Sequence, residues 1–173
     1  MYKYFLLITL ILFSTNLLAQ EALPNGYRNI VLGSSMEEVR EALANDTFFL
    51  YRGRPDASML FEDSTAIEVR GAGFIHRAFF LFYNDRLYNI TLELNPNMLD
   101  FFTIYQTFVA NYGEPTDLSP SRALWSNDEI EITIERELFV KYIDVAIFNE
   151  LRESSNIQDN LQNMIRDNFL SYF

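Results

Sequence analysis

The stretch RAFFLFYNDRLYNITLEL, residues 77–94, contains two β-rich runs on either side of the dipeptide Asn84-Asp85. Asn and Asp tolerate the positive φ angles of a two-residue hairpin turn. The pattern therefore predicts an antiparallel hairpin of Arg77–Tyr83 and Arg86–Leu94. In the second run the side chains alternate between the two sides of the strand. One side has Tyr88, Ile90, Leu92 and Leu94, and the other has Leu87, Asn89, Thr91 and Glu93.

The same alternation recurs later in the chain. In EIEITIE, residues 129–135, three isoleucines point one way, and Glu129, Glu131, Thr133 and Glu135 point the other way. Further strands are expected at Arg122–Ser126, Glu129–Arg136 and Leu138–Phe148. A period of two is typical of a sheet with one face against helices and one face in water.

Helix signals precede each group of strands. In LGSSMEEV, residues 32–39, Ser35 and Glu38 have the spacing of a capping box, which predicts a helix from Met36 to about Asn45-Asp46. Apolar residues at helical spacing predict a second helix over Met98–Asn111, and Gly113 then favours its end.

The order of a helix and then strands thus occurs twice, at about residues 28–94 and 97–148. Between the first helix and residue 77, strands are expected at Thr47–Arg52, Ser58–Glu62 and Thr65–Arg70. We expect one α+β domain over residues 20–173, built from an antiparallel sheet with helices on one face. A tandem α-β-β-β duplication explains the order, and coincidence is the alternative.

An amphipathic C-terminal helix is expected over about residues 155–171, docked on its own domain or on a partner.

The first nineteen residues have the build of a secretory signal peptide. Lys3 is followed by the apolar run Tyr4 to Phe13, and the small residue Ala19 precedes Gln20. The run is shorter than the roughly 20 apolar residues of a membrane span. We therefore expect export to the periplasm or the medium, with membrane contact only through the transient signal peptide. An uncleaved anchor is the alternative.

Charge and cysteine content restrict the partners and the chemistry. Without residues 1–19 the chain has 12 basic and 24 acidic residues, a formal charge of −12. Nucleic acid is therefore not an expected partner, because its recognition requires basic surface. The chain has no cysteine, which excludes thiol chemistry, Cys-ligated zinc and lipid attachment at a cleavage-site cysteine. No cofactor is expected.

The segment LGSSMEEV, with its helix followed by antiparallel strands, resembles the repeat unit of the β-lactamase-inhibitor-protein-like fold. The same unit is found in small outer-membrane assembly lipoproteins of the SmpA/OmlA type. The tandem arrangement looks more like the former and covers about residues 28–148. The chain departs from both in lacking cysteine for a disulfide or for lipidation. The resemblance implies a non-catalytic, exported protein that binds other proteins through an open sheet face.

Catalytic motifs are weak in this sequence. His76 is the only histidine, and no Gly-x-Ser-x-Gly segment presents a serine to it. The carboxylates Glu129, Glu131 and Glu135, with Asp144 nearby, leave two alternatives open. They could serve a carboxylate-based hydrolase acting on envelope glycan, or a calcium-binding module. A solvated acidic face explains them more simply.

We therefore expect a non-enzymatic protein that binds an envelope or extracellular protein through an exposed, acidic sheet face. The residues expected to contact the partner are Thr91, Glu93, Glu131, Thr133, Glu135, Tyr142 and Asp144. The first unit also concentrates positive charge, at Arg52, Arg54, Arg70, Arg77 and Arg86. Cross-strand ion pairing accounts for these arginines, and an anion site or self-association surface is the alternative.

Overall fold

The computed structural model describes residues 22–52, 56–61 and 64–155. The expected signal peptide lies outside these residues, and so does the expected C-terminal helix from residue 156 onward. Within the described ranges, no helix combines the length and the apolar character needed to cross a bilayer.

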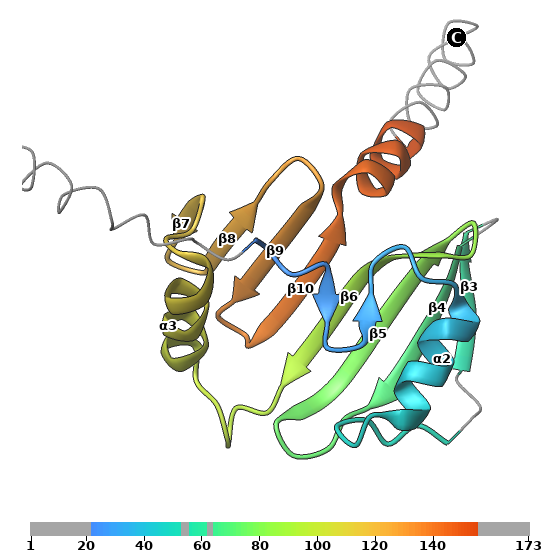
Figure 1. The fold of residues 1–173 in the computed structure, drawn as a ribbon, viewed down its shortest axis with the longest axis horizontal. Helices are drawn as coiled ribbons and strands as arrows, with labels where there is room; N and C mark the ends of the chain where they lie inside the picture. The colour runs from blue at the N-terminus through green and yellow to red at the C-terminus, as the bar shows by residue number, and fades with distance from the viewer. Residues whose placement is uncertain (1–21, 53–55, 62–63, 156–173) are drawn as a thin grey trace, which may run out of the picture.

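The fold is α+β, as predicted, and is dominated by one antiparallel sheet of eight strands (Figure 1). Helix α2 (Met36–Asn45) is followed by four strands: β3 (Asp56–Phe61), β4 (Ser64–Arg70), β5 (Ile75–Tyr83) and β6 (Arg86–Leu94). Helix α3 (Phe101–Tyr112) is followed by four more: β7 (Asp117–Ser119), β8 (Arg122–Ser126), β9 (Ile130–Glu135) and β10 (Phe139–Asp144). Each unit thus contains four strands after its helix, whereas a tandem α-β-β-β repeat has three.

The two units meet through their last strands. The strand order is β3-β4-β5-β6-β10-β9-β8-β7, so β6 pairs with β10 and each unit is a meander on one side of this seam. A short ladder of β1 (Gly26–Tyr27) and β2 (Ile30–Val31) precedes α2. No strand signal in the sequence indicated β1, β2 or β7, because two or three residues are too few to show a period.

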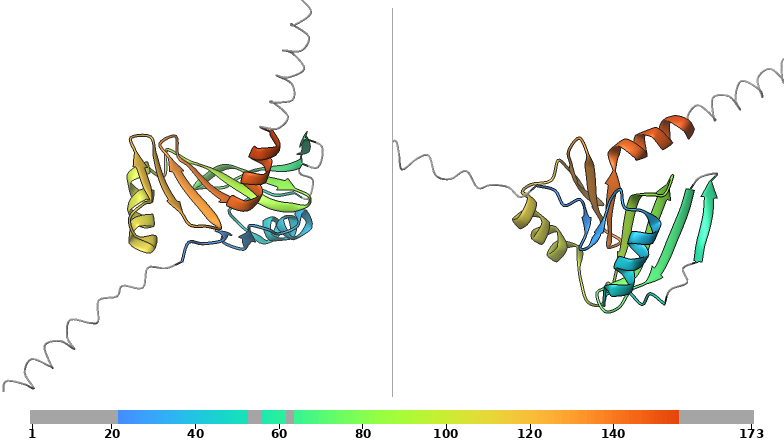
Figure 2. Two further views of the ribbon diagram at one scale, coloured as in Figure 1. Left: turned by 90° about the horizontal axis from the view of Figure 1, so that it is seen from above. Right: turned by 45° about the vertical axis from the view of Figure 1, so that its right-hand side comes forward.

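Both helices pack on the same face of the sheet, which we call the covered face (Figure 2). From α2, Val39 and Leu43 join a single core cluster with Phe80 of β5 and Trp125 of β8. From α3, Phe108 lies with its ring centroid 5.4 Å from that of Trp125. One continuous core therefore lies under both units.

Local signals explain where the helices begin. The capping box of α2 is present as predicted: Ser35 accepts from the Glu38 amide, and Glu38 accepts from the Ser35 amide. Helix α3 begins at Phe101 instead of Met98, because the Asp100 side chain caps it by accepting from the Thr103 amide at 2.9 Å.

Two strand predictions were wrong. Thr47–Arg52 forms no strand, and only Phe49 makes an isolated bridge, to Gly71. The strand expected over Leu138–Phe148 ends at Asp144, and residues 145–155 are helical. The C-terminal helix therefore begins ten residues earlier than expected. Its start is capped by Asp144, whose carboxylate accepts from the Ile147 amide at 3.0 Å.

Candidate functional site

The face of the sheet opposite the core, which we call the open face, contains five of the seven residues expected to contact a partner. Thr91 and Glu93 lie on β6, and Glu131, Thr133 and Glu135 lie on β9. Strand β10 lies between these strands, so Thr91 of β6 and Thr133 of β9 both lie beside Lys141 of β10.

Strand register arranges the open face into rungs that cross the sheet. The central rung runs from β4 to β7 through directly opposed residues: Glu68, Phe79, Thr91, Lys141, Thr133, Leu124 and Asp117. A second rung runs from β4 to β8: Ala66, Leu81, Asn89, Ile143, Glu131 and Ser126. On the central rung, Phe79 and Leu124 therefore flank the polar residues Thr91, Lys141 and Thr133.

Side chains of the open face shield one another. Thr133 is only 3% exposed although it points away from the core, and Ile143 is 9% exposed. Phe79, Leu81, Phe139 and Leu124 are half-buried. The face therefore presents packed apolar surface between its charges, a composition typical of protein interfaces.

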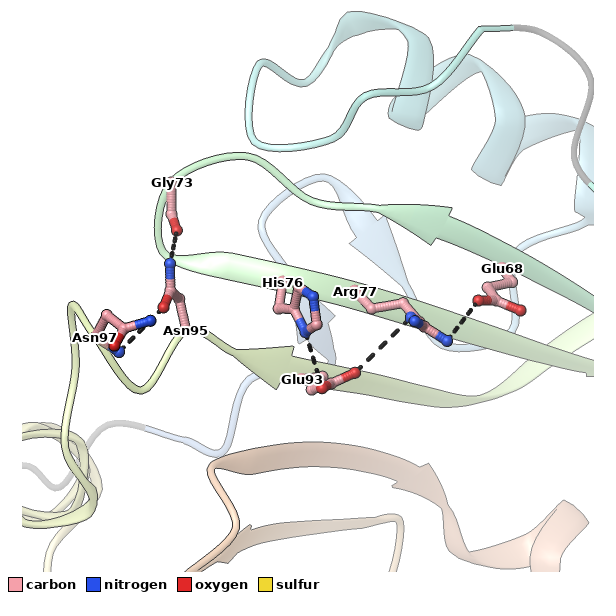
Figure 3. Close-up of polar contacts among 7 residues, drawn as sticks. All are labelled: Glu68, Gly73, His76, Arg77, Glu93, Asn95 and Asn97. Carbon is pink, nitrogen blue, oxygen red and sulfur yellow. Dashed lines mark hydrogen bonds and ion pairs between the residues drawn. The ribbon is translucent and has the colours of Figure 1, made fainter.

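Two of the three glutamates expected on this face are accompanied by basic side chains. Glu135 pairs with Lys141 at 2.6 Å, and Glu93 is contacted by His76 at 2.9 Å and by Arg77 at 3.9 Å (Figure 3). Glu131 accepts from the Thr133 hydroxyl at 3.5 Å. The pairing with Arg77 agrees with the cross-strand ion pairing considered for the arginines.

Two residues expected on this face lie elsewhere. Tyr142 is opposite Ile90 and Ile132 in register, on the covered face, and is 6% exposed. Burial, with Tyr112 and Tyr27 nearby, raises the pKa of its phenol well above the ordinary value. Asp144 caps the following helix. Both residues lie on the same side of β10, and alternation alone does not say which side of a strand faces the core.

Lys141 is the central residue that sequence reasoning missed. It lies between Thr91 and Thr133 on the central rung, and its ammonium neutralises Glu135. A signal was present, because Lys141 and Lys3 are the only lysines of the chain. A lysine between apolar residues of a strand indicates a position that faces away from the core.

The carboxylates of the open face are spread over several strands, from Glu68 on β4 to Asp117 on β7, and are engaged by other side chains. In the described part of the chain, no group of three or more His, Asp or Glu side chains is placed to hold a metal ion. Hollows occur at the α3 end of the sheet. One of about 670 Å³ is lined by Phe102 of α3, Leu118 of β7 and Arg136 of the β9–β10 turn, among others.

The protein is therefore a two-unit α+β protein. Each unit has one helix and four strands, the two units share one core, and α2 and α3 leave one face of the sheet open. The family model described as the TP0088 domain matches residues 25–154, and the chain belongs to this TP0088 domain family. No curated protein matches the chain, and no solved structure matches it.

Proposed function

We propose that this protein is exported and binds another protein of the envelope or extracellular space through the open face, without catalysing a reaction. The observation that carries the proposal is the central rung. Phe79, Thr91, Lys141, Thr133 and Leu124 lie side by side across five adjacent strands, opposite the face on which α2 and α3 pack. Half-buried apolar side chains among paired charges suit a partner surface of matching shape and polarity.

The export part of the proposal is supported by the sequence of residues 1–19. Intact-mass measurement of the product recovered from its own cell is expected to give a chain that begins at Gln20. A product that retains residues 1–19 would contradict cleavage after Ala19.

Variants of the open face test the binding part. The partner is first identified by crosslinking in the native cell, and its capture by purified variants is then quantified. Glu131→Lys reverses a charge on β9, and Leu124→Arg inserts a long cation into the central rung. Both are expected to reduce capture at least fivefold, because each misplaces charge on the contact surface.

Glu137→Lys is the matched control, since Glu137 is exposed in the β9–β10 turn, outside both rungs. Circular dichroism confirms that each variant is folded. Unchanged capture by both open-face variants, or equal loss with Glu137→Lys, would contradict the proposal.

A further inference from the structure

Basic side chains gather at one end of the open face, in an otherwise acidic protein. Arg70 ends β4, and His76 and Arg77 lie near the start of β5. Arg52 is exposed in the segment beside β4, where the Leu50 amide donates to the Arg70 carbonyl at 2.8 Å. We call Arg52, Arg70, His76 and Arg77 the arginine corner.

A β-bulge directs two consecutive basic side chains, His76 and Arg77, to the same side of β5. The register with β6 shifts between Ile75 and Arg77, which leaves His76 without an opposed residue. His76 and Arg77 consequently both reach Glu93, as Figure 3 shows. A regular strand would have placed them on opposite faces.

Arg70 and Arg77 are directly opposite each other in the β4–β5 register. Arg77 is matched by Glu68 at 3.0 Å and by Glu93, whereas Arg70 makes no ion pair with any other residue whose side chain the structure describes. Like charges in directly opposed positions destabilise a sheet. An external anion beside Arg70 would give it the counter-charge that Glu68 and Glu93 give Arg77.

Large apolar side chains flank the corner. Leu50 is 57% exposed, and Phe74 in the β4–β5 loop is 45% exposed. Asn95 holds this loop through two hydrogen bonds. Its backbone amide donates to the Phe74 carbonyl at 2.9 Å, and its side-chain amide donates to the Gly73 carbonyl at 3.1 Å (Figure 3). Phe74 is therefore presented on a fixed loop, and arginine beside aromatic anchors is enriched in protein interfaces.

We propose that the arginine corner binds a carboxylate-bearing, apolar-flanked segment of the protein partner. The inference rests on the proposed function and names the chemistry of the partner at one end of the open face. The Arg70 guanidinium binds the carboxylate of this segment, and Leu50 and Phe74 contact the apolar side chains on either side of that carboxylate. A membrane or nucleic acid requires a broad basic surface, which is lacking here because Glu68 and Glu93 lie within the corner.

Fluorescence anisotropy with a defined peptide tests the proposal. The probe is a labelled eight-residue peptide that alternates Glu with Leu and Phe, and its counterpart has Gln in place of each Glu. Both are titrated at low ionic strength with the protein as recovered from cells. The Glu peptide is expected to bind at least tenfold more tightly than the Gln peptide. Arg70→Ala is expected to weaken its binding at least fivefold, and Arg70→Lys less, because lysine lacks the bidentate fork.

Arg86→Ala is the matched control, because Arg86 is exposed at the opposite end of the β5–β6 hairpin and the charge change is the same. Equal loss with Arg86→Ala, or equal binding of the two peptides, would overturn the proposal. Sedimentation with vesicles containing phosphatidylserine forms a further arm. Arg70-dependent binding to these vesicles without binding to the peptide would assign the corner to lipid and overturn the proposal.

The two proposals fail separately. If Arg70→Ala leaves peptide binding unchanged while Glu131→Lys still reduces capture of the crosslinked partner, only the arginine corner is refuted. If neither variant has an effect, the binding role of the open face is refuted as well.

Discussion

Asp85 connects two elements through a single side chain. It occupies the β5–β6 turn with a φ of 57°, beside Asn84 with a φ of 49°, as predicted from the Asn-Asp dipeptide. Its carboxylate also accepts from the Met36 amide at 3.0 Å, in the first turn of α2. The turn prediction was local and was confirmed, whereas the contact with α2 spans 49 residues and has no sequence signal.

Replacing Asp85 tests this double role. Asp85→Ala is expected to lower the free energy of unfolding by about 1–2 kcal/mol, because a helix-capping acceptor is lost and alanine is strained at positive φ. Asp85→Asn keeps an acceptor and tolerates the turn, so it should cost much less. Urea denaturation of both variants measures the difference, and equal losses would contradict the assigned role.

Asp100 links the stability of α3 to pH. Hydrogen bonds from the Thr103 amide and hydroxyl hold the pKa of the Asp100 carboxyl below its ordinary value of 3.8. A carboxyl with a lowered pKa stabilises the fold above its ordinary pKa, and this stabilisation is lost as pH falls through the folded value. Asp100→Asn does not titrate. The melting temperature of the wild type should therefore exceed that of the variant at pH 6, and the gap should close as pH falls below about 4. A gap that is constant down to pH 2 would contradict this linkage.

At the level of elements, strand alternation was the most reliable signal. The bounds predicted for β6 and β8 are those observed. The strand that became β10 was predicted to be too long. Residues 145–148 are apolar enough for a strand, yet Asp144 starts a helix there. A short apolar run does not distinguish a strand from a helix.

The junction of β10 and this helix provides the prediction at the element scale. Asp144→Ala is expected to cost about 1 kcal/mol of stability through the lost cap, and Asp144→Asn should cost only a fraction of it. Because Asp144 serves the helix, capture of the crosslinked partner by folded Asp144→Asn should equal that of the wild type. Reduced capture by this variant would restore Asp144 to the contact surface.

For the whole molecule, the seam between β6 and β10 makes the two units interdependent. Leu92 is opposite Val140 and Ile90 is opposite Tyr142, and all four side chains belong to the common core. A tandem repeat is compatible either with two independent domains or with one cooperative body. The shared core favours one cooperative unfolding transition.

Trp125, the only tryptophan, reports on the second unit. Phe80→Ala in the first unit removes a fully buried ring and is expected to cost about 3–5 kcal/mol. The unfolding transition followed by Trp125 fluorescence should shift by the same amount as the transition followed by circular dichroism. Phe102→Ala, at a side chain that is 61% exposed, should leave both unchanged. An unshifted Trp125 transition would show that the units unfold independently.

Patterns within a few residues of one another were enough to indicate the α+β class, the capping box at Ser35, the hairpin turn and the alternation of β6 and β9. These features follow from local chemistry, such as the period of a pleated strand or the reach of a capping side chain. Other features could be known only from the folded chain. These are the pairing of β6 with β10, the position of Tyr142 on the covered face, the side-chain partners of Glu93 and Glu135, and the opposed positions of Arg70 and Arg77. Each depends on which distant segment lies alongside, and alternation is the same whichever face of a strand is buried.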